Sequence, residues 1–227
     1  MDRDDFIRAN TALAAPPLVP ELRLWLASEI TPIWEATEAM LAQSGVAPPF
    51  WAFPWVGGQA VARHILDHPA LVAGRRVLDF AAGSGLGAIA AARAGAAVVA
   101  ANEIDPVAAA AIAMNAAANG FGWRQLGEGA PTTQEILIDI HDRVGLTDLP
   151  YDVVIAGDVC YEQPMAARVA AWLTALAEAG VVVLMGDPGR NYLPASGLQA
   201  LAAYDVPTTR EIEDREVRRT VVYRVTG

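Results

Sequence analysis

Two short segments of the sequence carry the residues best suited to chemistry. Asp79–Gly87 reads Asp-Phe-Ala-Ala-Gly-Ser-Gly-Leu-Gly, so one carboxylate precedes three closely spaced glycines. Glycines let the backbone approach a ligand closely, and a helix that begins there offers free N–H groups. In Asp158–Tyr161 a carboxylate precedes an aromatic ring by three residues. A carboxylate can attract and orient an amine, and an aromatic ring can line a channel for a cationic side chain. The second segment therefore suits a lysine amine.

The glycine segment discriminates between two classes of cofactor. Dinucleotide-binding folds use Gly-x-Gly-x-x-Gly to hold a pyrophosphate. Here the spacing is Gly-x-Gly-x-Gly, and Asp79 lies four residues before Gly83. An acid at a strand end repels a pyrophosphate but suits a ligand with an ammonium group, such as S-adenosylmethionine (SAM). We therefore expect SAM as the cofactor, held by Asp79, Ala81, Gly83 and Gly85, and we disfavour a nicotinamide-dependent oxidoreductase.

A further acid follows the next predicted strand. Glu103 lies 18 residues after the second glycine of the loop, where a carboxylate can accept both ribose hydroxyls. Asp105 is the alternative, but we expect it to cap the helix that begins at Pro106. Glu103 and its neighbour Ile104 are therefore expected to contact the cofactor.

Alternatives remain for the residues that follow the third and fourth strands. Asp139 is placed to meet the adenine amino group, although Asp142 or a backbone group could serve instead. Asp158 could instead cap the helix begun by Pro164, and Tyr161 could simply pack in the core.

The elements that would position these residues alternate between strand and helix from residue 76 onward. The expected strands cover residues 77–80, 98–101, 135–138, 152–156, 181–185, 206–212 and 219–225, and the expected helices cover 88–94, 106–118, 165–178 and 198–204. This alternation predicts an α/β fold, a doubly wound, seven-stranded and mostly parallel sheet with an antiparallel C-terminal hairpin. Ligands bind such sheets beyond the carboxyl ends of the strands, where the first and fourth strands would bring Asp79 and Asp158 together.

The part of the chain before this region has a different pattern. Apolar spacing and proline positions predict helical stretches that begin near Asp4, Glu21 and Thr31. Residues 48–55 are too rich in proline for a helix, and a further helix is expected from Gln59. We expect one structural domain, in which residues 1–70 form a helical extension packed on an α/β core of residues 71–227.

The composition excludes several classes of function. The chain has 227 residues and 16 basic residues, all arginine, so mechanisms that need a protein lysine are excluded. The net charge of −10 disfavours nucleic-acid binding. No apolar run approaches the ~18 residues of a membrane span, and the single Cys160 fits a reducing compartment, so we expect a cytoplasmic protein. Eight acids against one arginine in residues 128–162 form either a face for a basic substrate or a solvated surface.

Taken together, the segments resemble those of class I, seven-β-strand SAM-dependent methyltransferases, with a Rossmann-like fold. The resemblance rests on Asp79–Gly87, Asn102–Pro106 and Asp158–Tyr161. A finer resemblance, to bacterial electron transfer flavoprotein β-subunit lysine methyltransferases, rests on Phe50–Gln59 and Gly186–Arg190. The resemblance covers nearly the whole chain and implies that the α/β core is the methyltransferase domain.

The resemblance also implies roles for single residues. Trp55 would pack beside the cofactor, with Gln59 at its border. Asp158 and Tyr161 would form the substrate motif, face the methyl group and carry the catalysis. Apart from the resemblance, Arg190 could either hold a substrate carboxylate or brace its loop.

The implied reaction is methyl transfer from SAM to a lysine of the electron transfer flavoprotein β-subunit, with a ribosomal protein as a further candidate substrate. Direct displacement needs no metal, and His64 and His68 lack a third ligand for a zinc site. The sequence departs from the general motif at Ala81, which stands where that motif has its first glycine. Alternatives are a small-molecule amine N-methyltransferase and a non-catalytic SAM-binding protein.

Overall fold

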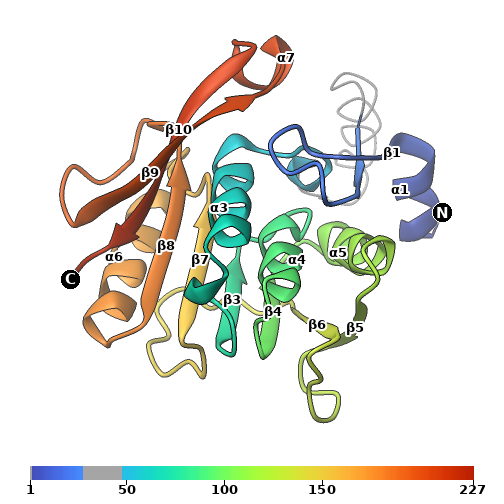
Figure 1. The fold of residues 1–227 in the computed structure, drawn as a ribbon, viewed down its shortest axis with the longest axis horizontal. Helices are drawn as coiled ribbons and strands as arrows, with labels where there is room; N and C mark the ends of the chain where they lie inside the picture. Colours follow the sequence, from blue (N-terminus) through green and yellow to red (C-terminus); the bar gives the residue numbers. More distant parts are fainter. Residues whose placement is uncertain (1, 28–47) are drawn as a thin grey trace.

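The central feature of the molecule is an eight-stranded sheet. The computed structural model describes residues 2–27 and 48–227. The strands are β3 (Arg76–Phe80), β4 (Val98–Asn102), β5 (Gly122–Gln125), β6 (Glu135–Asp139), β7 (Val153–Gly157), β8 (Val182–Asp187), β9 (Leu198–Pro207) and β10 (Val217–Val225). Their order is β5-β6-β4-β3-β7-β8-β10-β9; pairing is parallel from β5 to β8, and β10 is antiparallel to both neighbours. The predicted α/β fold with its antiparallel hairpin is confirmed (Figure 1).

Helices cover both faces of this sheet (Figure 1). One face carries α3 (Val56–Asp67), α4 (Leu86–Arg93) and α5 (Pro106–Ala118), and the other carries α6 (Met165–Glu178). Alternate side chains of a strand point to opposite faces. Val77 and Ile155 accordingly pack in the core beneath α3 and α4, whereas Leu78 and Val154 pack in a second core with α6.

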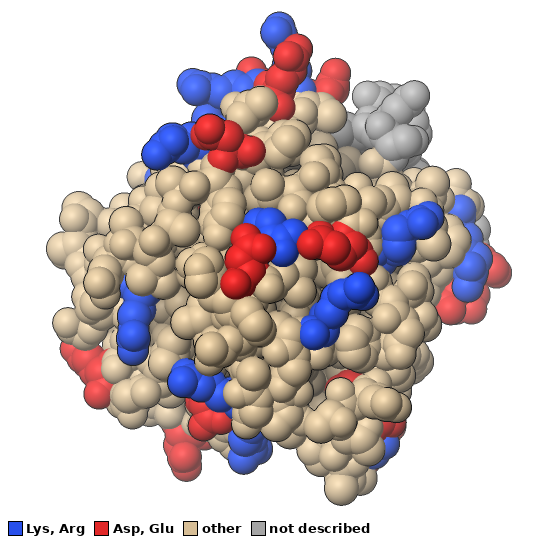
Figure 2. Space-filling model, in the orientation of Figure 1, with Lys and Arg blue, Asp and Glu red and all other residues tan. Residues whose placement is uncertain are grey.

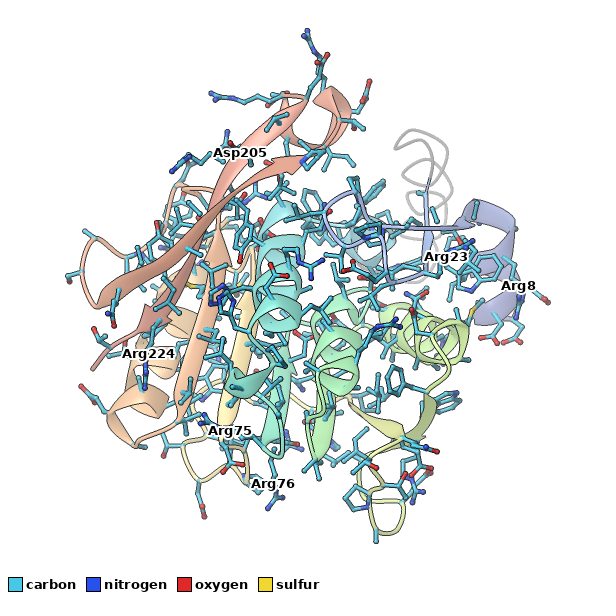
Figure 3. The ribbon with its side chains drawn as sticks, in the orientation of Figure 1. Arg8, Arg23, Arg75, Arg76, Asp205 and Arg224 are labelled. Carbon is cyan, nitrogen blue, oxygen red and sulfur yellow. The ribbon has the colours of Figure 1, made fainter. Side chains whose placement is uncertain are left out.

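The two strands expected to carry the site are direct neighbours in the sheet. Leu78 of β3 lies opposite Val154 of β7, and Phe80 lies opposite Ala156. Since the two strands are parallel, the residues that follow them emerge at the same edge. In Figure 3 the labelled Arg76 marks the opposite, amino end of β3.

Two predictions about the C-terminal part and one about the sheet edge were wrong. Residues 198–204 form the first part of β9 rather than a helix, and the segment predicted as strand 206–212 turns into the short helix α7 (Arg210–Glu213). Pairing with β10 across nine residue pairs overrides the helical propensity of this alanine-rich segment. Residues 122–125, expected to be loop, form the edge strand β5, which gives the sheet one strand more than predicted.

The N-terminal segment is only partly helical. α1 (Arg3–Asn10) matches the first predicted helix, but β1 (Ala12–Ala14) and β2 (Leu24–Leu26) form a two-stranded antiparallel ribbon. The helix predicted from Glu21 is therefore wrong, because alternate leucines from Leu22 onward are the buried residues, which is a strand period. The helix predicted from Thr31 lies outside the described residues.

Residues 48–55 contain a short 3₁₀ helix, η1 (Phe50–Ala52), and no α-helix, and α3 begins at Val56, three residues before the expected start. A second 3₁₀ helix, η2 (Pro69–Leu71), follows α3. In the described parts of the chain, no helix has the length and apolar character needed to span a membrane.

The face that α3 and α4 form is mostly uncharged, and its few charged residues carry both signs (Figure 2). The acidic segment 128–162 is also not uniformly acidic. Glu135 pairs with Arg124 at 2.6 Å, and Asp139 pairs with Arg143 at 2.6 Å. Several of its acids therefore have partners inside the fold rather than facing a substrate.

Candidate active site

A pocket lies at the carboxyl ends of β3 and β7, beside the amino end of α3. Five of the predicted site residues line it: Trp55, Asp79, Ala81, Gly83 and Asp158. Its walls come from the segment before α3, the glycine loop after β3 and the end of β7. The fold therefore brings together residues that lie about 100 positions apart in the sequence.

Asp79 is a buried carboxylate with one hydrogen-bond donor among the described contacts. The backbone N–H of Ala88, in the first turn of α4, donates to its Oδ2 at 2.7 Å. A Cβ on Gly87 would lie 2.8 Å from Oδ1 and 2.9 Å from Oδ2, so any other residue there would force the Asp79 carboxyl to shift. Burial raises the pKa of Asp79 to about 8. A cation close to this carboxyl is therefore what would ionise it at neutral pH.

The loop after β3 owes its shape to left-handed backbone conformations. Ala81 has φ of 51°, Gly83 has 51° and Gly85 has 77°. Gly85 is the residue before the first turn of α4. Ala81 thus adopts, at some conformational cost, the backbone that the general motif assigns to glycine.

Glu103 follows β4 and faces the glycine loop. Its Oε2 accepts from the backbone N–H of Gly83 at 3.0 Å, and its Oε1 accepts from that of Asp105 at 3.1 Å. Burial raises its pKa. The side chain of Asp105 accepts from the N–H of Val107 at 2.8 Å, which confirms the expected helix cap. Ile104, between the two acids, is 67% exposed.

Asp139 lies at the end of β6 but is fully buried and does not line the pocket. Arg143 donates to both of its oxygens, at 2.6 and 3.0 Å, and the ring of His141 lies 2.9 Å from Oδ1. Although burial opposes it, the hydrogen bonds from these two side chains lower the pKa of Asp139. The surroundings of Asp139 describe an internal ion pair, so its predicted contact with adenine stays a prediction.

Asp158 follows β7 in a left-handed conformation, with φ of 57°. Arg190 donates to its Oδ1 at 2.7 Å, and the backbone N–H of Gly58 donates to Oδ2 at 3.1 Å. It does not cap α6, because Pro164 holds the cap position without a side-chain hydrogen bond. Burial raises the pKa of Asp158 to about 6, opposed by the charge of Arg190.

Aromatic side chains form a rim that includes Trp55, which lines the pocket together with Asp158, whereas Phe50 and Tyr161 do not line it. Tyr161 is 41% exposed, so it is not a core residue, and its ring meets that of Phe50 edge to face at 5.6 Å. Phe50 meets Trp55 in the same way at 5.9 Å. The rim offers ring faces and edges to an apolar chain that carries a cation.

Arg190 braces the site from the loop that follows β8. Besides Asp158, its guanidinium pairs with Glu213, at the end of α7, and lies 5.8 Å from the ring centroid of Trp55. The loop itself is held by Asp187, whose Oδ1 accepts from the N–H groups of Gly189 and Arg190 at 2.7 Å each. The sequence did not single out Glu213, since nothing in its spacing ties it to Arg190.

Three glycines allow α3 to approach the strand ends. A Cβ on Gly57 would lie 2.3 Å from the carbonyl oxygen of Gly186 and 2.5 Å from Oδ2 of Asp158. A Cβ on Gly157 would lie 2.6 Å from the nitrogen of Gly58. Gly57 of the Trp-Val-Gly-Gly segment is therefore a packing requirement for the position of Asp158, whereas a Cβ on Gly58 would meet nothing within 4 Å.

Other candidate residues have structural partners. Gln59 is buried and joins the N–H of Leu18 to the carbonyl of Pro54 at 3.0 and 2.6 Å, outside the pocket. His64 hydrogen-bonds Tyr204 at 3.0 Å. Cys160 is buried, and burial raises the pKa of its thiol to about 12, so it is not a thiolate nucleophile.

The fold is found in solved methyltransferase structures. A putative RNA methyltransferase from Pyrococcus horikoshii superposes with a TM-score of 0.52 at 19% identity, over 85% of this chain and 96% of that one. Residues 64–184 match the model of the family described as ribosomal protein L11 methyltransferase (PrmA). The family match, on a Rossmann-like fold, makes this chain a methyltransferase.

Closer relatives define the family. The electron transfer flavoprotein β-subunit lysine methyltransferase of Xenopus laevis is 32% identical over 96% of this chain and 85% of that protein. The protein of the same description in Danio rerio is 33% identical over 98% of this chain and 83% of that protein. The chain belongs to the electron transfer flavoprotein β-subunit lysine methyltransferase family.

Proposed function

We propose that this protein transfers a methyl group from SAM to a lysine of the electron transfer flavoprotein β-subunit. The observation that carries the proposal is identity of 32–33% to relatives of that description across nearly the whole chain. The pocket adds independent support, since it combines a buried acid beside a glycine loop with a second acid beside an aromatic rim. We place the activity in the cytoplasm, as the single cysteine allows no internal disulfide.

The β3 side of the pocket suits the cofactor. Asp79 and the N–H groups of the glycine loop would bind the amino-acid tail, with Trp55 beside it. Glu103 keeps lone pairs free for the ribose hydroxyls, because each of its oxygens accepts one backbone hydrogen bond. The exposed side chain of Ile104 offers an apolar surface to adenine. Asp139, whose two oxygens both accept from Arg143, would orient the carboxyl end of β6.

The β7 side suits the lysine. Bound SAM supplies an electrophilic methyl carbon on a sulfonium. Asp158 would attract the lysine ammonium and then orient the neutral amine, and Tyr161 would line the path of its apolar stem. Lysine titrates near ~10.4 in water and must lose a proton before its nitrogen forms the new bond. The protein would hold the lysine nitrogen in line with the methyl carbon and its sulfur, so that the carbon–sulfur bond breaks and the thioether leaves as the carbon–nitrogen bond forms, and it would exclude water.

Purified protein, SAM and the electron transfer flavoprotein β-subunit test the proposal by mass spectrometry of the intact subunit. The expected product gains 14 Da per methyl group on lysine. Ribosomal protein L11 is the second substrate to include, because the family model that matches residues 64–184 carries its name. Free amines form a third arm. Methylation of free amines alone would replace the proposal by the small-molecule reaction.

A further inference from the structure

One guanidinium lies between two carboxylates at the edge of the pocket. Nη2 of Arg190 donates to Oδ1 of Asp158 at 2.7 Å and to Oε1 of Glu213 at 2.5 Å, and its Nη1 donates to Oε2 of Glu213 at 3.1 Å. Nε of Arg190 also donates to Oδ1 of Asp158 at 3.2 Å, so each carboxylate is held by two nitrogens of the same guanidinium. We call Asp158, Arg190 and Glu213 the acid–arginine–acid cluster.

The cluster is withdrawn from solvent. The exposed fractions of the three side chains are 9% for Asp158, 18% for Arg190 and 3% for Glu213. Charges at such positions are weakly screened, so their sum governs the local potential. Two carboxylates and one guanidinium leave a formal charge of −1. The buried Asp187 adds to the negative potential while it holds the Arg190 loop through backbone N–H groups.

Arg190 links Glu213 to Asp158, which lines the pocket. It ends α7, which lies at the tip of the β9–β10 hairpin (Figure 1), and it does not line the pocket. Without Glu213, the guanidinium would neutralise Asp158. With Glu213, Asp158 faces the pocket beside a cation that already has a second partner.

We propose that Glu213 is a positioning residue that makes the site selective for a cationic substrate, by taking up the charge of Arg190 so that Asp158 remains available to the lysine ammonium. The inference rests on the proposed function and extends it to the C-terminal hairpin. It assigns to Arg190 the role of a cation shared between Glu213 and Asp158.

The test compares Glu213→Gln with Glu216→Gln on the electron transfer flavoprotein β-subunit. Glu216 is the matched control, because it lies on the same hairpin but is exposed and pairs only with the exposed Arg210. For Glu213→Gln we expect KM for the protein substrate to rise about tenfold while kcat changes less than about threefold. Glu216→Gln should match wild type. Binding of S-adenosylhomocysteine by calorimetry checks that the cofactor side is intact in each variant.

A double variant separates charge from packing. Arg190→Gln/Glu213→Gln removes one charge of each sign, so the formal charge stays at −1 wherever Asp158 is ionised. At a pH above the titration of Asp158 in this variant, we expect its KM to return to within about threefold of wild type. Asp158 titration gives a second readout, as the break of kcat/KM near pH 6 should move down in Glu213→Gln, where a negative neighbour is lost. It should move up in the double variant, where the cation is lost as well.

The outcomes are distinct. An active wild type with an unchanged KM in Glu213→Gln overturns the inference alone, and so does a double variant with a higher KM than the single one. If Glu213→Gln does not fold, the double variant decides by itself, since a KM tenfold above wild type contradicts the charge argument. A wild type that methylates no protein lysine overturns both the proposed function and this inference.

Discussion

A buried aspartate follows or ends each of the neighbouring strands β3 and β7, yet the pKa values of the two carboxyls differ. Both place an aspartate out of contact with bulk water, and both use a non-glycine residue with positive φ, Ala81 and Asp158. Asp79 has a backbone N–H as partner, and its pKa rises to about 8. Asp158 has a guanidinium, and its pKa rises only to about 6.

The difference shows that burial alone does not fix the charge of a site. With pKa values of about 8 and about 6, Asp79 is mostly protonated and Asp158 mostly ionised at neutral pH. If Asp79 binds the cofactor, as proposed, its carboxyl would ionise on binding, whereas Asp158 would already be ionised when the lysine binds.

The largest expected effect comes from removing the charge at the β7 end. Asp158→Asn keeps the shape and tolerates the left-handed backbone, so it tests the carboxylate itself. We expect kcat/KM to fall at least about 100-fold, as when other preorganised polar contacts are lost. Affinity for S-adenosylhomocysteine should change little. Glu162→Gln, an exposed acid four residues on, serves as control and should keep full turnover.

A second test adds a methyl group beside Asp158 in one variant and beside Asp79 in another. Gly57→Ala would push a Cβ into Asp158 and Gly186, and Gly87→Ala would push one into Asp79. Each should lower the free energy of unfolding by about 1–3 kcal/mol through overpacking. Gly58→Ala, whose Cβ would meet nothing within 4 Å, is the control and should not destabilise. Urea denaturation measures all three; equal stabilities would show that the glycines are dispensable.

The third test addresses the protonated state of Asp79. Its pKa of about 8 means that it holds a proton at pH 6.5, and pairing with the cofactor's ammonium requires the ionised form. Binding should therefore release up to about one proton, and affinity should increase as pH rises from 6 towards 8. Calorimetry of S-adenosylhomocysteine binding in buffers of different ionisation enthalpy measures this. Asp79→Asn should release none; the same release in that variant would remove Asp79 from the account.

The smallest effect is expected at the aromatic rim. Tyr161 contacts Phe50 through its ring, so Tyr161→Phe should keep kcat/KM within about threefold of wild type. Tyr161→Ala should lower it about tenfold, within the range for a lost ring contact to a cation. Steady-state kinetics decides, and equal losses in both variants would assign the role to the hydroxyl instead.

The sequence predicted the parts of the molecule whose signals are local. The glycine loop, the cap at Asp105 and the alternation of strands with helices depend on neighbouring residues, and they place Asp79 and Asp158 at one sheet edge. The alanine-rich 198–204 segment was misread as helix because its strand partner is distant.

The electrostatic part of the site could not be read from sequence. Arg190 and Glu213 are 23 residues apart, and their pairing depends on how the hairpin folds over the loop after β8. The burial of Asp139 and its ion pair with Arg143 are likewise tertiary facts. Sequence spacing predicted which carboxylates lie near the site but not their hydrogen-bonding partners, and these partners determine the pKa of each carboxyl.

The most direct test of the central claim is the rate of lysine methylation in the electron transfer flavoprotein β-subunit by wild type and Asp158→Asn, measured at saturating SAM by mass spectrometry of the digested subunit. The account predicts methylated lysine with wild type, and a rate at least about 100-fold lower for the variant with its cofactor binding intact. Equal rates for the two proteins, or no methylated lysine with wild type, would contradict it.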